Sequence, residues 1–179
     1  MLNLSDAVLI VVDVQGKLAR IVVGSEEMIG QIQKLVKGLL ALEIPIILTN
    51  QVPEKLGGTI EEIAGLLPDH EQISRTAFSV FRSVDMLSRL ADLKRKQVIL
   101  CGVETHICLY QSALDLMNSK YEVYLVVDGT SSRRGGDKDV AIKRVSVEGV
   151  NLTTVEMTLF ELMRDARHPA FKSIAKIIK

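Results

Sequence analysis

Two thiols and an imidazole lie within the segment CGVETHIC, at positions 101–108, directly after an apolar run. A set of this kind could bind a metal ion, close a disulfide or supply a nucleophile. Structural zinc sites usually pair cysteines two to four residues apart and add a second pair elsewhere. Here six residues separate the two cysteines, the chain has no further cysteine, and its three histidines are not paired at ligand spacing. We therefore expect no metal site and no other cofactor.

A disulfide between Cys101 and Cys108 is also unexpected. Cys101 ends the apolar run VILC and reads as a small buried hydrophobic residue, whereas Cys108 should lie on the helix that follows. The N-terminal stretch MLNLSDAVLIVVDVQ has no positively charged region ahead of its apolar residues, so we read no signal peptide there. Two cysteines and no signal peptide predict a reducing, cytoplasmic location.

Cys108 is the candidate nucleophile. Thr105 is a suitable N-cap, which would make Cys108 the third residue of the helix THICLYQSALDLM. The positive end of a helix dipole lowers the pKa of a thiol, and the thiolate is the reactive form. His106 would point away from Cys108 on this helix, so we assign it no role. The alternative for Cys108 is packing on the helix face, with Ile107, Leu114 and Met117 as neighbours.

A reactive cysteine also needs a proton acceptor, and Asp13 is placed to be one. It ends the otherwise apolar strand AVLIVVD at positions 7–13. The alternative is an ordinary loop or helix-capping aspartate. Position favours the first interpretation, because Asp13 and Cys108 follow two strands that we expect to be neighbours in the sheet.

The elements that must position these residues alternate between strand and helix patterns. Buried strands are predicted at 7–13, 44–50, 97–103 and 121–128, with shorter strands at 70–74 and 150–156. Apolar residues recur at helical spacing from Met28 to Leu42, with Ser25 as a candidate N-cap. Helices are also predicted at 137–147 and at 169–178, where Pro169 would occupy the first turn.

This alternation predicts a single domain over residues 1–179 with a three-layer α/β/α, Rossmann-like fold. Its centre would be a parallel sheet of about six strands, with helices on both faces. In the commonest strand order the first and fourth strands are neighbours, and ligands bind beyond their carboxyl ends. Asp13, Gln15 and the segment 104–108 should therefore line one crevice.

Composition and motifs exclude several partners. Lys plus Arg and Asp plus Glu both total 22, so no net field attracts nucleic acid or an acidic membrane surface. The first apolar stretch is too short to span a bilayer. The first turn, DVQGKLA, contains neither G-x-G-x-x-G nor a P-loop, which argues against a nucleotide-binding Rossmann domain. We expect a small-molecule substrate, no nucleic acid and no membrane partner.

Five segments together carry a resemblance to a known family. They are VVDVQ (11–15), ILTNQVPEKLGGT (47–59), ISRTAFSVF (73–81), CGVETHICLYQSALDLM (101–117) and VVDGTSSR (126–133). With them the chain resembles the isochorismatase-like family of cysteine hydrolases, and most closely its small single-domain branch. The similarity extends over nearly the whole chain, including the ending DARHPAFKSIAKIIK.

The resemblance implies a catalytic triad of aspartate, lysine and cysteine. The aspartate corresponds to Asp13 and the cysteine to Cys108, while Arg75, in the segment SRTAFS, occupies the lysine position. Arginine keeps the positive charge that would stabilise a thiolate, but it cannot shuttle a proton. Lys17 is a second candidate for that charge, although a solvated surface lysine is the simpler interpretation.

The family also implies a structured turn beside the nucleophile. The peptide bond between Val103 and Glu104 would be cis, and the backbone amides of Glu104 and Cys108 would form an oxyanion hole.

Metal-dependent relatives carry an Asp-x-His set after the second strand, where this chain reads TNQVPE without histidine, so no catalytic metal is predicted. Asn50 and Gln51 are then candidate amide contacts to a substrate, with loop capping as the alternative. Gln15, in the same crevice, is a further candidate substrate contact. Phe78 is a candidate pocket wall together with Phe81, although both could instead be core residues.

The expected function is therefore that of a cysteine-dependent hydrolase acting on a small amide-like, carbonyl or vinyl ether substrate. The alternative is a catalytically weakened family member that serves as a binding or scaffold protein, because Arg75 replaces the lysine. The resemblance further implies a homo-oligomer, a dimer or tetramer. The uncharged, apolar-rich composition agrees with self-association.

Overall fold

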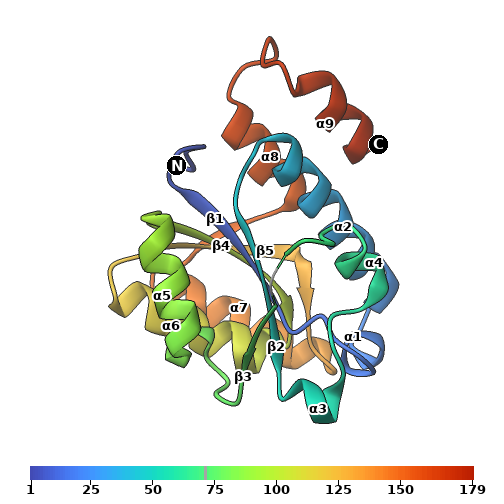
Figure 1. Ribbon diagram of the computed structural model, residues 1–179, viewed down its shortest axis with the longest axis vertical. Helices are drawn as coiled ribbons and strands as arrows, with labels where there is room; N and C mark the ends of the chain where they lie inside the picture. Colours follow the sequence, from blue (N-terminus) through green and yellow to red (C-terminus); the bar gives the residue numbers. More distant parts are fainter. Residues whose placement is uncertain (71) are drawn as a thin grey trace.

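Six parallel strands form the centre of the molecule in the computed structural model, which describes residues 1–70 and 72–179 (Figure 1). Their order across the sheet is β3-β2-β1-β4-β5-β6. They are β1 (Ala7–Val12), β2 (Ile46–Gln51), β3 (Gln72–Arg75), β4 (Gln97–Val103), β5 (Glu122–Ser131) and β6 (Asn151–Thr153). The predicted parallel sheet and its strand order are confirmed. Glu71, part of the predicted strand 70–74, lies outside the described residues.

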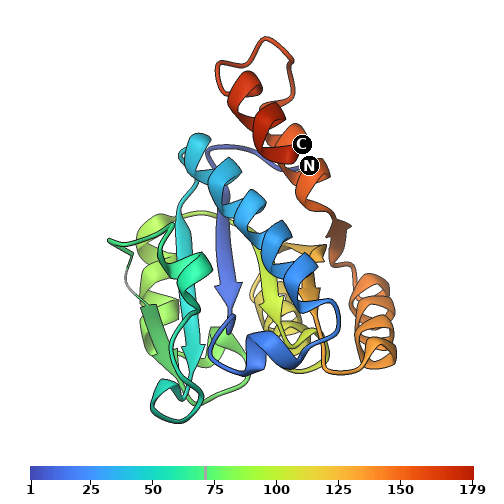
Figure 2. The ribbon, with the colours of Figure 1, turned by 90° about the vertical axis from the view of Figure 1, so that its right-hand side faces the viewer.

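Helices cover both faces of this sheet, because successive strand side chains point to opposite sides. Leu9 and Val11 of β1 belong to one core, whereas Val8 and Ile10 belong to the other. The first core is covered by α2 (Ser25–Ala41), α4 (Glu61–Ala64), α8 (Val155–Met163) and α9 (Phe171–Ile178). The second is covered by α5 (Val84–Leu93), α6 (Tyr110–Asn118) and α7 (Gly135–Val147). Figure 2 shows α2 lying along the first face, so the predicted three-layer fold is confirmed.

Short helical turns connect these elements. They are α1 (Leu18–Ile21), α3 (Pro53–Leu56), the 3-10 helix η1 (Val80–Arg82) and the π-helical turn η2 (Thr105–Leu109). None of the helices within residues 1–70 and 72–179 is both long and apolar enough to cross a membrane.

Gly102 explains how β1 and β4 approach each other at the carboxyl edge of the sheet. It pairs with Val12 and has a left-handed φ of 116°. A Cβ at this position would lie 2.0 Å from the carbonyl oxygen of Val12, so only glycine fits. The close pairing places the residues that follow the two strands side by side.

Several predicted boundaries are wrong. Ser25 is the first residue of α2 rather than its N-cap, because Gly24 occupies the cap position and the Ser25 hydroxyl donates to the carbonyl oxygen of Ala19. Pro169 is not in the first turn of α9, which begins at Phe171. The predicted strand 150–156 is shorter, since the side chain of Thr154 caps α8 by accepting from the amide of Met157.

Candidate active site

Asp13 lies directly after β1 and has no solvent exposure. Its backbone is left-handed, with a φ of 54°, which is uncommon for residues other than glycine but better tolerated by Asp and Asn. The Asp13 amide donates to the carbonyl oxygen of Thr49 at 3.1 Å, which ties this turn to β2. Its Oδ1 accepts from the Thr49 hydroxyl at 3.3 Å, so β2 also orients the carboxylate.

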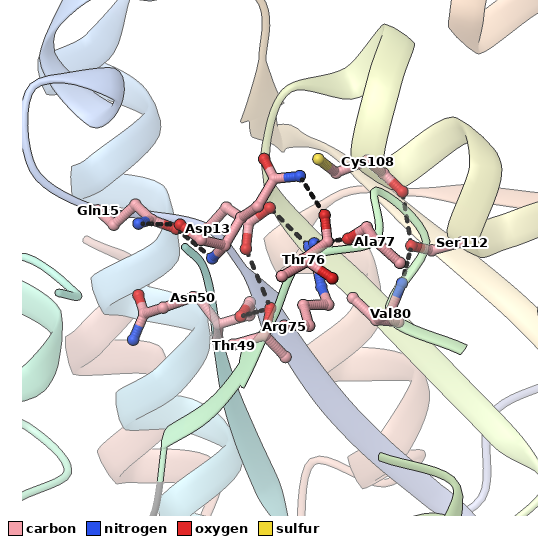
Figure 3. A network of polar contacts seen from close by, with 12 residues as sticks. Asp13, Gln15, Thr49, Asn50, Arg75, Thr76, Ala77, Val80, Cys108 and Ser112 are labelled. Atoms are coloured by element: carbon pink, nitrogen blue, oxygen red, sulfur yellow. Dashed lines mark hydrogen bonds and ion pairs between the residues drawn. The ribbon is translucent and has the colours of Figure 1, made fainter. Parts of the chain in front are cut away.

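Arg75, the last residue of β3, reaches this carboxylate. Its Nη2 lies 2.6 Å from Oδ2 of Asp13, and both side chains are almost completely buried (Figure 3). Its Nη1 donates to the carbonyl oxygen of Ala77. The buried Nε of Arg75 has no hydrogen-bond partner in the part of the chain that the structure describes. Lys17, the other candidate cation, is exposed.

Burial raises the pKa of Asp13 above the ordinary value of a carboxyl group. The positive charge of Arg75 opposes this shift, as do interactions with the Cys108 thiol, Arg75 and the Thr49 hydroxyl. An isolated buried carboxylate would be far more costly, so Arg75 is what makes an ionised Asp13 tolerable in this position.

Cys108 is the fourth residue of the π-helical turn η2 and is only 4% exposed. The predicted capping by Thr105 is wrong, because the Thr105 hydroxyl is hydrogen-bonded to that of Thr130 at 2.8 Å and Glu104 is the cap residue. Cys108 also belongs to the apolar core on the α6 side of the sheet. Cys108 therefore packs in the core and also interacts with Asp13. Both alternatives from the sequence, a packing residue and a nucleophile, agree with this position.

The pKa of the Cys108 thiol is raised to about 12, chiefly by burial and also by the negative charge of Asp13, with Arg75 partly offsetting both. The expectation that a helix dipole lowers this pKa is therefore wrong. A short π-helical turn inside an apolar core does not compensate for the lost hydration of a thiolate. The Cys108 thiol is therefore protonated at neutral pH.

The turn between β4 and Cys108 contains a cis peptide bond between Val103 and Glu104. The carbonyl oxygen of Glu104 accepts from the amides of Ile107 and Leu109, both at 3.2 Å. The buried Glu104 side chain accepts from the amide and the Nε of Arg133, each at 3.0 Å. Hydrogen bonds therefore fix both the backbone carbonyl and the side chain of Glu104, so that its backbone amide has a defined direction.

The amide side chains predicted to contact substrate make hydrogen bonds within the chain. Gln15 is fully buried, donates to the carbonyl oxygens of Gln51 and Gly57, and accepts from the Gln51 amide. Asn50 donates to the Gln72 side chain and accepts from the Thr59 hydroxyl. This bonding favours loop capping for Asn50 and shows that Gln15 ties two loops together. Substrate contact by either residue stays a prediction.

Gln51 and Phe78 are more accessible. The Gln51 side chain is half-buried and donates to the carbonyl oxygen of Thr76 at 3.2 Å. Phe78 is 51% exposed, so it is not a core residue. Phe81 packs edge-to-face on Tyr121 with ring centroids 5.7 Å apart, as a core aromatic does. Gln51 and Phe78 thus remain candidates for contact with a substrate.

Sequence reasoning missed Thr49 and Ser112. Thr49 is a polar residue in a buried strand, and that signal was available in IILTN. Ser112 lies four residues after Cys108 in α6 and is fully buried. Nothing in the surrounding sequence indicates its hydrogen bond to the amide of Val80, 32 residues earlier in the chain.

Two hollows on the surface are lined by other residues. One, of about 760 Å³, is lined mainly by β3 and α5, and the other, of about 200 Å³, by His106, Tyr110 and α7. Neither is lined by Asp13, Arg75 or Cys108. We take the buried polar cluster rather than either hollow as the candidate site, because only the cluster joins a nucleophile to a base. Within residues 1–70 and 72–179, no group of three or more His, Cys, Asp and Glu side chains could hold a metal ion.

Comparison with known proteins gives consistent results. The family model described as Isochorismatase domain matches residues 7–157. Isochorismatase domain-containing protein 2 of Xenopus laevis is 35% identical over 174 residues, which cover 96% of this chain and 83% of the relative. The Bos taurus protein of the same name is 37% identical over 175 residues, with 97% and 83% covered. The solved structure of a MAR1 ribonuclease from Caenorhabditis elegans has a TM-score of 0.93 at 33% identity and covers 99% of this chain and 91% of its own. The chain therefore belongs to the isochorismatase-domain family and has the fold of an isochorismatase-like hydrolase.

Proposed function

We propose that the protein is a cysteine-dependent hydrolase of a small amide-like or related carbonyl compound, with Cys108 as its nucleophile. One observation carries the proposal: the buried Asp13 carboxyl, paired with the buried Arg75 guanidinium, interacts with the thiol of Cys108, a residue of the apolar core. Buried charges are costly, and a stable core would not need these three groups together.

Asp13 is the proposed general base. A base works best when its pKa approaches the working pH, and burial moves the pKa of Asp13 in that direction. Arg75 cannot take the proton, so its role is electrostatic: it holds Asp13 ionised and stabilises negative charge on sulfur. The unpartnered Nε of Arg75 could donate to the thiolate or to the substrate as negative charge develops.

The reaction would proceed in two stages. As the sulfur of Cys108 attacks the carbonyl carbon, its proton passes to Asp13 and the carbonyl oxygen becomes an oxyanion. Collapse of this intermediate breaks the bond to the leaving group, which takes the proton from Asp13, and a thioester remains. Water then attacks the thioester with Asp13 as base, which releases the acid and restores the Cys108 thiol.

The oxyanion would be held by backbone amides of the turn that follows β4. We propose the amides of Glu104 and Cys108 as donors, because one begins the turn and the other belongs to the nucleophile. The carbonyl oxygen of Glu104 is held by the amides of Ile107 and Leu109, and its side chain by the amide of Arg133.

A small substrate fits the limited access to the sulfur. Cys108 is 4% exposed. Gln51 donates to the carbonyl oxygen of Thr76, between Arg75 and the half-exposed Phe78 in the chain. We propose that Phe78 contacts an apolar part of the substrate and Gln51 a polar part.

Turnover of a substrate panel tests this function. The panel should contain small primary amides, carbamoyl compounds, esters and vinyl ethers, with a short RNA included because the C. elegans relative is named a ribonuclease. Cys108→Ala should abolish hydrolysis of any substrate found, while Cys101→Ala should retain most of it, since Cys101 is a fully buried core residue. Binding without turnover across the panel would instead favour the scaffold role.

Self-association stays a prediction for this chain. Large apolar side chains lie exposed on several elements, among them Val84 on α5 and Val140 and Val147 on α7. We propose a homo-oligomer that covers part of this surface. Sedimentation velocity at micromolar concentration should show a species larger than the monomer, and a single monomeric species would contradict the proposal.

A further inference from the structure

The Ser112 hydroxyl joins two parts of the site that are distant in sequence. It donates to the carbonyl oxygen of Cys108 at 2.5 Å and accepts from the amide of Val80 at 2.9 Å (Figure 3). A hydroxyl has one proton and two lone pairs, so it can make both bonds at once. Ser112 is fully buried, so no water competes for either bond.

Val80 ends a segment, Thr76–Val80, that is held by other side chains of the site. Gln51 donates to the carbonyl oxygen of Thr76, and Arg75 donates to that of Ala77. The Ser112 hydroxyl makes a third hydrogen bond to this segment, accepting from the amide of Val80. The same hydroxyl also donates to the carbonyl oxygen of Cys108, the residue that carries the thiol. The segment with Phe78 is therefore fastened to the Arg75 side and to the Cys108 side of the site.

A serine that bonds to the carbonyl four residues earlier is common in helices and implies nothing by itself. The bond to Val80 is different, because it joins residues 32 positions apart and satisfies a buried amide. The backbone around Cys108 is also irregular, since the amide of Leu109 bonds to Glu104, five residues earlier. The regular hydrogen bonds of an α-helix, each to the fourth residue before, do not fix the backbone of Cys108 here. The hydrogen bond from the Ser112 side chain to the Cys108 carbonyl oxygen can do so.

We propose that Ser112 is a positioning residue, which fixes the turn carrying Cys108 against the segment Thr76–Val80 and so holds the thiol beside Asp13 and Arg75. This inference rests on the proposed nucleophilic role of Cys108. Ser112 itself bonds only to backbone groups among the described residues and takes no part in proton transfer.

The first test is Ser112→Ala on a substrate from the panel. A displaced nucleophile should lower kcat by about tenfold or more, because sub-ångström placement controls such reactions. The KM should change by less than about threefold, since Gln51 and Arg75 still hold the segment that carries Phe78 through Thr76 and Ala77. Thr158→Val is the matched control: it removes a fully buried hydroxyl, bonded to Thr153 at 3.1 Å, at the β6 edge of the sheet. It should lower Tm and leave kcat unchanged.

The second test needs no substrate. The alkylation rate of Cys108 by iodoacetamide is followed against pH by mass spectrometry of the peptide that contains it. The wild-type rate should still rise at pH 10, because the pKa of the thiol is raised to about 12. In Ser112→Ala the midpoint should fall by about one pH unit or more, as the thiol leaves its buried place beside Asp13. A fall in Tm with kcat and pH profile unchanged would overturn the proposal.

Should Ser112→Ala fail to fold, Val80→Pro tests the same link from its other end. It removes the donating amide but keeps the bond between Ser112 and Cys108. Val80 is the first residue of η1, where proline is tolerated, and Ser79 before it is extended, with φ −71° and ψ 129°. The same downward shift of the alkylation midpoint is expected, and an unchanged midpoint would count against the link. Turnover that survives in Cys108→Ala would reject the proposed function, while a shifted profile would still show that Ser112 positions the thiol.

Discussion

Nη2 of Arg75 lies 2.6 Å from Oδ2 of Asp13, in an ion pair that spans β2 and is almost closed to solvent. That Arg75 takes the place for which the family resemblance implies lysine stays a prediction, and the ion pair with Asp13 agrees with it. Because a guanidinium does not exchange protons at neutral pH, proton transfer would fall to Asp13 alone.

Replacing Asp13 by Asn should lower kcat/KM by about 10²- to 10⁴-fold, because the amide cannot accept the thiol proton. Asparagine tolerates the left-handed backbone of this position, so the turn after β1 should survive. The buried Arg75 charge would lose its partner, which typically costs about 3–5 kcal/mol of unfolding free energy. Steady-state kinetics and urea unfolding check both effects, and Asn at full activity would remove Asp13 from the mechanism.

Arg75→Lys should preserve or raise turnover, because the charge beside Asp13 is kept and an ammonium can also move a proton. Arg75→Ala should raise the pKa of the Cys108 thiol further, since Arg75 lowers it in the native site. It should also destabilise the fold, because Asp13 would be left as an unpaired buried charge. Arg82→Ala is the control: it breaks an exposed pair with Asp115 and should leave the unfolding midpoint and kcat nearly unchanged.

Stability should fall on the alkaline side because of the two buried thiols. Burial raises the pKa of Cys108 to about 12 and that of Cys101 still higher, so both stay protonated in the folded chain. The unfolded chain loses these protons near pH 9, and from there upward it binds fewer protons than the folded chain. The free energy of unfolding should therefore fall by up to about 1.4 kcal/mol per pH unit for each thiol. Urea unfolding at pH 8, 9 and 10 measures the slope, which should be shallower in Cys108→Ala.

Gly102→Ala should disrupt the junction of β1 and β4. The added Cβ would meet the carbonyl oxygen of Val12 at 2.0 Å, and the φ of 116° is unfavourable for alanine. We expect a large drop in Tm or no soluble protein. Gly136→Ala provides the contrast, because its Cβ would meet nothing within 4 Å in the first turn of α7. That variant should be stabilised by about 0.5–1 kcal/mol, and equal effects of the two changes would refute the packing argument.

Continuous apolar runs made the sheet predictable. A strand such as AVLIVV, buried on both faces, leaves few alternatives to a parallel sheet with two helical layers, and its neighbours follow from the common strand order. The first residues of the helices were harder to predict. Ser25 and Thr105 look like N-caps in the sequence, but tertiary partners, the Ala19 carbonyl and the Thr130 hydroxyl, take up their side chains.

The strand ends predicted that Asp13 and Cys108 lie near each other, and the family resemblance alone pointed to Arg75, while the catalytic roles of all three stay predictions. The electrostatics of the site were not predictable. The pKa of Cys108 could not be read from position on a helix, because it depends on how deeply the turn is buried and on its distance from Asp13. Ser112 was missed for a similar reason, since its partner Val80 is close only after folding.

Intact-mass spectrometry of a rapidly quenched reaction tests the central claim most directly. With an ester or amide that the panel shows to be turned over, the wild-type chain should gain the mass of the acyl group, and digestion should place it on the peptide that contains Cys108. The adduct should be absent from Cys108→Ala and should form far more slowly in Asp13→Asn, where the thiol proton has no acceptor. An adduct on any other residue, or undiminished turnover in Cys108→Ala, would contradict covalent catalysis by this cysteine.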